Sequence, residues 1–259
     1  NHMTSTNSSN DDSINNSSTV PEPLEFYRHI DNTVCGYLPN QESNSIFINP
    51  DANPTEDQLN SLHLQGFRRS GRHVYRPNCP ECNQCYSSRV INTQFQSSKS
   101  QKKTLSRNKD VRLSWADAVF SDEHYQLYEN YINKRHQDGE MYPASENQYI
   151  NFLIESHGLH KFLEARDAQG NLLACCVVDI FYDGLSAIYS YFDTDQERRS
   201  LGRYMVLGLI SQGLMRGIPY TYLGYWIKES HKMNYKSDYR PLEIFNGDNW
   251  QKLIDLDNI

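Results

Sequence analysis

The chain has 259 residues, of which 37% are hydrophobic and 22% are charged, and its net charge at pH 7 is −7. A chain of this length and composition can bury a core in one large domain or two small ones, which excludes a fibre or a peptide. The sequence has no apolar run of about 18 residues and no secretory signal pattern, so we expect a cytoplasmic protein with no membrane partner.

The first segment offers almost no apolar side chains for burial. Residues 1–23 are mainly Ser, Thr and Asn and are predicted to form a disordered tail, in which Asn1 and His2 ahead of Met3 are an expression scar. A small N-terminal module, rich in Cys and Arg, is predicted over residues 24–96.

Two local signals define structure inside this module. Thr55 and Gln58 form a capping box that predicts a helix over residues 55–65, and Gly66 supplies its C-terminal stop. The apolar and basic residues that alternate through 66–77, with a Ser-Gly turn near the middle, predict a β-hairpin.

Residues 97–259 carry the elements of a larger domain. In chain order we predict a polar Lys-rich stretch over 97–110, a strand over 111–120, helices over 122–137 and 146–157 (the second with a capping box from Ser145 and Gln148), strands over 161–166, 172–182 and 186–192, a helix over 200–216 and a strand over 220–226. The last strand–helix–strand step should place two parallel strands side by side. An antiparallel meander followed by a helix and a strand is typical of acyl-CoA N-acyltransferases, so we predict an α+β fold with a GNAT-like acyltransferase core.

In such a core the acyl donor lies where the two parallel strands separate, at their carboxyl ends. Those ends carry Tyr191, Phe192 and Asp193 on one strand, and Tyr225 and Trp226 on the other. These side chains are therefore candidates for the active site.

The charge is distributed unevenly. Between Gly66 and Arg112 there are eleven basic and two acidic residues, a charge of +9 that leaves −16 for the rest of the chain. Such asymmetry indicates an anionic partner that meets one face of an acidic protein. The alternative is an ordinary solvated basic face.

Three of the six cysteines have metal-ligand spacing. Cys79, Cys82 and Cys85 form a C-x2-C-x2-C pattern, which is typical of zinc or iron–sulfur sites, and Cys35 is the candidate fourth ligand. A reduced, metal-free loop is the alternative. The remaining two cysteines, at 175 and 176, are adjacent in a strand and should point to opposite faces as core thiols.

The turn that opens the helix over 200–216 is a poor phosphate cradle. Coenzyme A normally sits on backbone N–H groups of a Gly-rich turn, but residues 196–203 contain one glycine and end in the bulky Arg203. We therefore expect no coenzyme A partner. Together with the basic segment, this points to an acyl donor that is itself a nucleic acid, an aminoacyl-tRNA.

A series of motifs carries a resemblance over about residues 24–250. They are Cys35-Gly36-Tyr37-Leu38-Pro39, Gly66-Phe67-Arg68-Arg69-Ser70-Gly71, Tyr75-Arg76-Pro77 with the cysteines, Ser97-Ser98-Lys99-Ser100-Gln101-Lys102-Lys103, Arg135-His136-Gln137-Asp138-Gly139-Glu140-Met141, Tyr191-Phe192-Asp193, Ser200-Leu201-Gly202-Arg203-Tyr204, the segment from Tyr222 to Lys236, and Tyr239-Arg240-Pro241-Leu242-Glu243. In this order they resemble the bacterial aspartate/glutamate leucyltransferases, relatives of the eukaryotic arginyl-tRNA–protein transferases.

The resemblance implies transfer of leucine from Leu-tRNA to proteins that begin with Asp or Glu, which creates an N-degron for proteolysis. Arginyl transfer to the same acceptors is the alternative. The eukaryotic relatives carry a Cys-Gly-Tyr-Cys motif and a Cys-Cys pair that are linked to a regulatory iron–sulfur cluster, whereas Leu38 replaces the second cysteine here. No cofactor is expected to be required for catalysis, and an iron–sulfur cluster or zinc at the four cysteines is conditional.

Attack of an α-amine on an activated ester needs positioning and oxyanion stabilisation more than a strong base. Our hypothesis is that Tyr191 and Tyr225 donate to the oxyanion or orient the amine, while Asp193 or Glu140 accepts its proton. Each tyrosine has the alternative role of a half-buried aromatic residue with a satisfied hydroxyl.

Binding of the acceptor's acidic side chain requires a fixed cation. We expect Arg76 to be the first candidate, with Arg69 and Arg89 as further candidates that could instead pair with carboxylates of the fold.

Binding of the tRNA phosphates requires exposed basic groups, and the terminal adenosine requires a segment that closes over it. The tRNA-binding candidates are Lys99, Lys102, Lys103, Arg107, Lys109, Lys232, Tyr235 and Lys236.

Three rival functions stay open at this point. They are a coenzyme A-dependent acetyltransferase, a non-catalytic reader of acidic N-termini, and a thiol redox sensor that uses the cysteine cluster.

Overall fold

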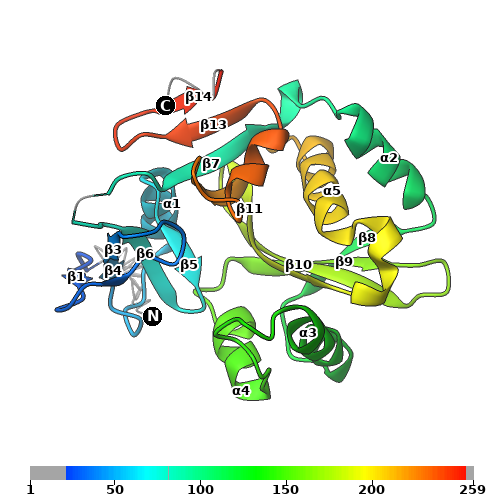
Figure 1. Cartoon of the computed structure of the whole chain (residues 1–259), viewed down its shortest axis with the longest axis horizontal. Helices are drawn as coiled ribbons and strands as arrows, with labels where there is room; N and C mark the ends of the chain where they lie inside the picture. Colours follow the sequence, from blue (N-terminus) through cyan, green and yellow to red (C-terminus); the bar gives the residue numbers. More distant parts are fainter. Residues whose placement is uncertain (1–21, 81, 255–259) are drawn as a thin grey trace, which may run out of the picture.

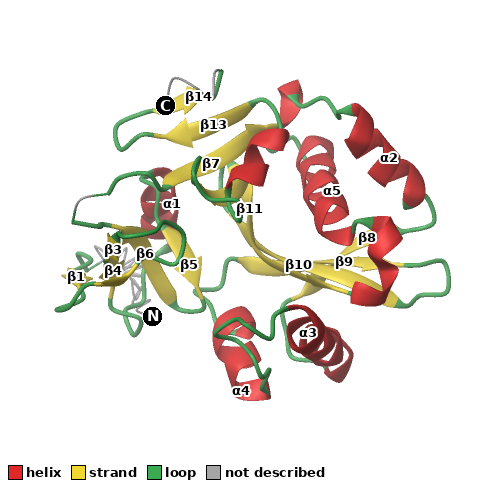
Figure 2. Ribbon diagram, in the orientation of Figure 1, coloured by secondary structure: helices red, strands yellow, loops and turns green. Residues whose placement is uncertain are grey.

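The computed structural model describes residues 22–80 and 82–254, and the predicted tail falls almost wholly outside them. The strands are β1 (Phe26–Arg28), β2 (Thr33–Val34), β3 (Glu42–Ser43), β4 (Ser45–Ile48), β5 (Arg68–Ser70), β6 (His73–Pro77), β7 (Tyr86–Ile91), β8 (Arg112–Asp117), β9 (His160–Arg166), β10 (Leu172–Ile180), β11 (Gly184–Phe192), β12 (Tyr220–Trp226), β13 (Leu242–Phe245) and β14 (Trp250–Lys252). The α-helices are α1 (Glu56–Leu64), α2 (Lys99–Arg107), α3 (Asp122–Arg135), α4 (Glu146–Tyr149) and α5 (Leu201–Met215). Shorter helical turns are η1 (Asn92–Gln94), η2 (Ile150–Ile154), η3 (Thr194–Arg199) and η4 (Asn234–Asp238). Helices and strands alternate along the chain in a mixed α and β fold (Figures 1 and 2).

An eight-stranded sheet forms the centre, in the order β14-β13-β7-β12-β11-β10-β9-β8. Strands β9 to β11 are the predicted antiparallel meander, and β8 pairs antiparallel with β9 at the edge of the sheet. After α5 the chain returns as β12, which runs parallel to β11. The predicted order of meander, helix and parallel strand is therefore confirmed.

The helices cover both faces of this sheet, with α5 on one side and α3 and α4 on the other (Figure 1). The adjacent cysteines of β10 point into the two different cores, as strand alternation requires. Cys176 packs in the core beneath α5, and Cys175 packs in the core with residues of α3. Both thiols are buried, which confirms their prediction as core residues.

A second sheet, in the order β1-β4-β6-β5, forms the N-terminal part together with α1. Thr55 and Gln58 make both hydrogen bonds of the predicted capping box. At the other end Gly66 has φ +87°, and the amides of Gly66 and Phe67 donate to the carbonyls of His63 and Leu62, which closes the helix. The predicted hairpin is β5 and β6, which pair antiparallel from Arg68 to Tyr75.

Strand β7 comes from the segment 24–96, which was predicted to form the N-terminal module, but it belongs to the central sheet. It is hydrogen-bonded between β13 and β12 in the central sheet, with Arg89 opposite both Tyr222 and Glu243. The last part of this segment therefore pairs with strands from the C-terminal end of the chain.

Two predictions about helices were wrong in detail. No helix was predicted in the polar, Lys-rich stretch over 97–110, but it contains α2, which begins with a capping box from Ser98 and Gln101. The single helix expected over 146–157 is a short α4 followed by the π-helical turn η2, and Ser145 accepts the Gln148 amide without the reciprocal bond. Among the described residues, we find no helix of the length and apolarity that a bilayer crossing requires.

Candidate functional site

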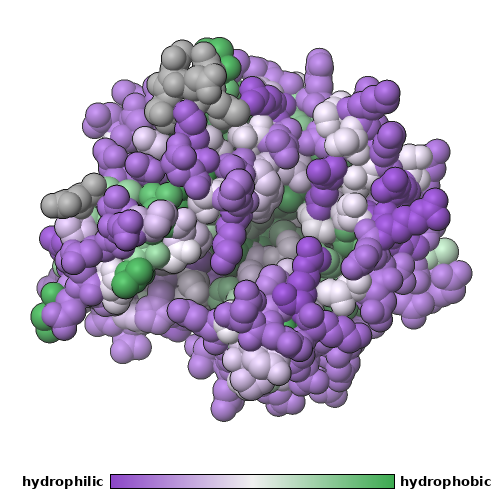
Figure 3. Space-filling model, in the orientation of Figure 1, coloured by the Kyte–Doolittle hydropathy of each residue, from purple (hydrophilic) through white to green (hydrophobic). Residues whose placement is uncertain are grey.

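The two parallel strands separate as predicted. β11 and β12 pair over only three positions, from Gly184 with Tyr220 to Ser186 with Tyr222, although each strand continues further. Beyond this point their carboxyl ends diverge. In the orientation of Figure 1, the space-filling view shows a hollow near the centre of the molecule, with hydrophobic side chains at its floor (Figure 3).

The structure does not bring Tyr191 and Tyr225 together. Tyr191 is fully buried, and its hydroxyl is hydrogen-bonded to His124 Nδ1 at 2.8 Å and to the Tyr149 hydroxyl at 3.0 Å. His124 Nε2 in turn contacts Glu164 at 2.5 Å. Burial raises the pKa of Tyr191, so this phenol stays protonated within a chain of polar groups that sequence reasoning missed.

The other three catalytic candidates lie in separate surroundings. Tyr225 is half-buried, and its hydroxyl donates to the Gly66 carbonyl at 2.9 Å. Asp193 caps η3 by accepting the Asp195 amide, and it lines an open groove with Arg135. Glu140 is exposed on the loop after α3.

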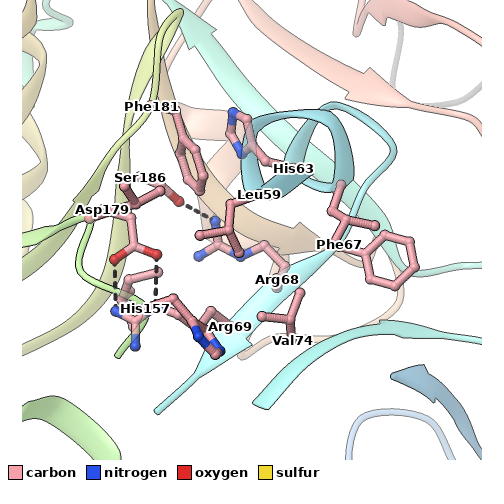
Figure 4. Close-up of a pocket in the computed structure, with 13 residues that line it drawn as sticks. Leu59, His63, Phe67, Arg68, Arg69, Val74, His157, Asp179, Phe181 and Ser186 are labelled. Carbon is pink, nitrogen blue, oxygen red and sulfur yellow. Dashed lines mark hydrogen bonds and ion pairs between the residues drawn. The ribbon is translucent and has the colours of Figure 1, made fainter. Parts of the chain in front are cut away.

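Two of the three candidate arginines are already neutralised within the fold. Arg69 binds Asp179 with two bonds of 2.8 and 2.7 Å, and the side chains of both are less than a tenth exposed (Figure 4). Arg89 pairs with Glu243 at 2.8 Å and donates to the Tyr222 hydroxyl. These are structural ion pairs.

Arg76 differs from both. Its guanidinium lies over the Phe67 ring at 5.2 Å, and within residues 22–80 and 82–254 it makes no ion pair with a carboxylate. Its side chain lines a cavity of about 360 Å³ together with Tyr225. Of the three predicted arginines, Arg76 alone keeps its charge available there.

Sequence reasoning missed Arg68. Its guanidinium reaches the point where β11 and β12 separate, and it donates to Ser186 Oγ at 2.5 Å and to the Ala187 carbonyl at 2.8 Å (Figure 4). Desolvation lowers its pKa. The cavity beside it, shown in Figure 4, measures about 20 Å³, room for a water molecule and not for a leucine side chain. The only sequence signal for Arg68 was its place in the hairpin motif.

The segment after β12 holds three of the predicted tRNA-binding residues in different environments. Lys232 and Tyr235 are exposed, whereas Lys236 is only 6% exposed. Lys236 Nζ donates to the Tyr225 carbonyl at 2.6 Å and contacts Met233 Sδ at 3.2 Å. Burial and, to a smaller extent, the nearby Arg68 together lower the pKa of Lys236 to about 7. A buried ammonium is poorly placed to contact a phosphate on the protein surface.

The other basic candidates share one surface. Lys99, Lys102, Lys103 and Arg107 are exposed on α2, and at 100° per residue they fall on one side of the helix. The opposite side is buried through Gln101 and Thr104. Lys109 follows directly and is also exposed, so the helix presents what we call the α2 basic face, made of these five residues.

The four cysteines predicted as metal ligands line the same 360 Å³ cavity as Arg76. Burial and the neighbouring thiols raise the pKa of Cys85 to about 12. In the part of the chain that the structure describes, no three Cys, His, Asp or Glu side chains have metal-ligand geometry. The soft donor set fits zinc or an iron–sulfur cluster, but the thiols as placed would have to move to bind one.

Comparison with known proteins places this arrangement in a family. Residues 33–103 match the model of the N terminus, and residues 123–246 that of the C terminus, of arginine-tRNA-protein transferases. The matches place the chain in the class of tRNA-dependent protein aminoacyltransferases. The chain is 46% identical to an aspartate/glutamate leucyltransferase of Teredinibacter turnerae over 87% of this chain and 92% of the relative. It is 42% identical to one of Chromohalobacter salexigens, over 94% and 99% of the two chains. The chain belongs to the aspartate/glutamate leucyltransferase family.

Solved structures show only weak likeness. The C-terminal domain of a putative lysylphosphatidylglycerol synthetase from Agrobacterium fabrum gives a TM-score of 0.45 at 13% identity, over 76% of this chain and 70% of that one. The crystal structure of FemX gives 0.43 at 7% identity, over 78% and 79%. At these scores neither likeness bears on function.

Proposed function

We propose that this chain transfers leucine from leucyl-tRNA to the α-amine of proteins that begin with Asp or Glu. The observation that carries the proposal is 46% identity to an aspartate/glutamate leucyltransferase over nearly the whole of both chains. In the reaction, the amine nitrogen attacks the ester carbonyl carbon, a C–N bond forms, and the C–O bond to the tRNA ribose breaks. The ribose oxygen leaves as a hydroxyl after it takes up a proton, and the product is an N-degron.

Most of the chemistry in this scheme is positioning. We place the reaction in a GNAT-like core, between the diverging ends of β11 and β12, with Tyr225 as the phenol nearest the acceptor. Asp193 and Glu140 stay candidates for the proton acceptor. Tyr191, buried behind β11, is a positioning residue in this scheme, because its hydroxyl is occupied by His124 and Tyr149.

The donor in this proposal is a tRNA and not coenzyme A. The α2 basic face supplies exposed cations for phosphates. Arg203, in the turn where a GNAT enzyme would hold pyrophosphate, donates to Ser100 Oγ of α2 at 2.9 Å. It therefore links the two helices across that turn.

The direct test uses tRNA charged with radiolabelled leucine or arginine and acceptor peptides that differ only in starting with Asp, Glu or Ala. We expect leucine on the Asp and Glu peptides and none on the Ala peptide. Arginine in its place would support the alternative, arginyl transfer. Binding of acidic peptides with no transfer from either tRNA would indicate a non-catalytic reader.

Arg76 is our candidate for recognising the acidic acceptor. The change Arg76→Glu should abolish transfer to Asp and Glu peptides while leaving the affinity for leucyl-tRNA nearly unchanged. Arg76 lines the cavity of Tyr225, where this scheme places the acceptor, and the residues of the α2 basic face do not line that cavity. Acceptor kinetics and filter binding with the same protein measure both quantities. Equal damage to both would remove Arg76 from this role.

The cysteine cavity is a separate proposal. Cys35, Cys79, Cys82 and Cys85 would hold zinc or an iron–sulfur cluster, whose binding requires thiolates and releases protons. Metal analysis and visible absorbance of protein purified without oxygen test this. Because ester aminolysis needs no metal, we expect the metal-free protein to retain transfer; activity that follows the redox state of the thiols would instead favour a redox sensor.

A further inference from the structure

Two cations meet where β11 and β12 separate. Gly224 lies two residues beyond Tyr222, the last residue of β12 that pairs with β11. A Cβ placed on Gly224 would be 3.4 Å from Arg68 Nη2 and 3.4 Å from Lys236 Nζ. The two basic groups therefore both lie next to the backbone of Gly224, where glycine adds no side chain between them.

Neither cation has a carboxylate partner in the described chain. The ion pairs among residues 22–80 and 82–254 include neither Arg68 nor Lys236. Asp179 acts electrostatically on Arg68, but Arg69 already binds both of its oxygens. Burying two basic groups without a counter-charge disfavours their charged forms, and the pKa of Lys236 is lowered to about 7, so an anion that arrives from outside would stabilise the charged form of Lys236.

Each cation is anchored but keeps donors free. Arg68 uses one hydrogen each on two nitrogens, for Ser186 and Ala187, so three of its five N–H groups are left. Lys236 donates to the Tyr225 carbonyl and contacts a thioether, and its third hydrogen is left. The anchoring holds both heads in fixed positions, which favours selective binding.

Tyr225 relates this pair of basic groups to the cavity proposed above for the acceptor. Its carbonyl accepts from Lys236, and its side chain lines that cavity beside Arg76. Burial raises the pKa of the Tyr225 phenol, and Arg68 and Arg76 both oppose this rise, so both guanidinium groups lie within electrostatic range of it.

We infer that Arg68 and Lys236 form an anion site at Gly224 that binds the side-chain carboxylate of the acceptor's first residue. This inference rests on the proposed function and adds two residues to its acceptor site. A carboxylate fits better than a tRNA phosphate, because Lys236 is buried and Arg68 is half-buried, whereas the exposed basic groups stand apart on α2. Lys236 is then a specificity residue for the acceptor instead of a clamp on the terminal adenosine.

The test uses the full chain and the variants Lys236→Met and Arg68→Lys. The matched control is Lys228→Met, a half-buried lysine of the same segment. Calorimetric titration with peptides that begin with Asp or Asn, without tRNA, reports the acceptor site alone. We expect both test variants to weaken binding of the Asp peptide by about 10- to 100-fold, with little change for the Asn peptide. The control should match the wild type.

The same proteins then go through filter binding with leucyl-tRNA and the transfer assay. We expect unchanged tRNA affinity, and a raised KM for the Asp peptide with kcat nearly retained. An Asp-peptide affinity unchanged in both test variants would overturn the inference, and so would a loss confined to tRNA affinity, which would assign the cations to a phosphate. Because the titration needs no turnover, an absence of leucine transfer by the wild type would count against the proposed function alone.

Discussion

At the scale of single residues, the ion pair between Arg69 and Asp179 shows what a buried charge does in this fold. It joins the hairpin to β10, and both side chains are almost fully buried. We expect Arg69→Met to lower the free energy of unfolding by about 3–5 kcal/mol, because Asp179 would stay buried without a partner. Urea denaturation measures the loss. The double change Arg69→Met with Asp179→Leu should recover most of it; a double variant as unstable as the single one would contradict this account.

Sequence alone could not separate the three candidate arginines. The residue types and the motif are right for all of them, yet Asp179 lies 110 residues from Arg69 and Glu243 lies 154 residues from Arg89. Pairing over such separations depends on tertiary structure. For the same reason, the burial of Lys236 could not be predicted. Its sequence position indicated an exposed basic residue, but it is buried by packing against β12.

At the scale of secondary-structure elements, the α2 basic face makes the clearest prediction. If its lysines neutralise phosphates, the change Lys99→Gln with Lys102→Gln and Lys103→Gln should weaken tRNA binding and reduce the slope of log affinity against log salt by about two to three. Filter binding over a salt series measures this. Lys161→Gln, which removes an exposed lysine paired with Asp117, is the control. A slope equal to the wild type in the triple variant would exclude α2 from the phosphate contacts.

A second junction between elements should be sensitive to acid. His157 Nε2 is hydrogen-bonded to the Arg72 carbonyl at 2.9 Å. Burial lowers the pKa of His157, and the charges of Arg72 and Arg69 lower it too, while the hydrogen bond and Asp179 partly oppose this shift. Since the unfolded chain then binds more protons, this histidine's contribution to stability is complete above its ordinary pKa of about 6.5 and is lost as the pH falls below it. We expect His157→Gln to lose less free energy of unfolding than the wild type between about pH 7.5 and pH 5, measured by urea denaturation. An identical loss would contradict the assignment.

Most elements could be predicted from the sequence because their signals are local. The capping box at Thr55, the glycine stop at Gly66 and the strand over 220–226 all appear as expected. The helix α2 carries the same kind of cap, but its buried side is made of Gln101 and Thr104, so an apolar periodicity was missing. In the N-terminal sheet, the hairpin of β5 and β6 was predicted, whereas the short strands β1 and β4 lacked such local signals.

At the scale of the whole molecule, ligands should separate the proposed donor from its rival. A ligand that binds only the folded chain raises its stability, by about 2.7 kcal/mol when present at 100 times its Kd. We expect leucyl-tRNA to raise the thermal denaturation midpoint and acetyl-coenzyme A to leave it unchanged, because Arg203 bridges the turn that would receive the pyrophosphate. Stabilisation by acetyl-coenzyme A would instead support the alternative function, a coenzyme A-dependent acetyltransferase.

The position of β7 has a consequence for how the protein is made. This strand forms its ladder with β12 and β13, whose residues are synthesised about 130 and about 150 positions later. At about 5–20 residues per second, β7 emerges from the ribosome roughly 7 to 30 seconds before its neighbours exist. During that interval its two edges are open to pairing with other chains. A nascent chain that stalls before residue 220 is therefore a substrate for chaperones, and a fragment that ends near residue 103 should not fold independently.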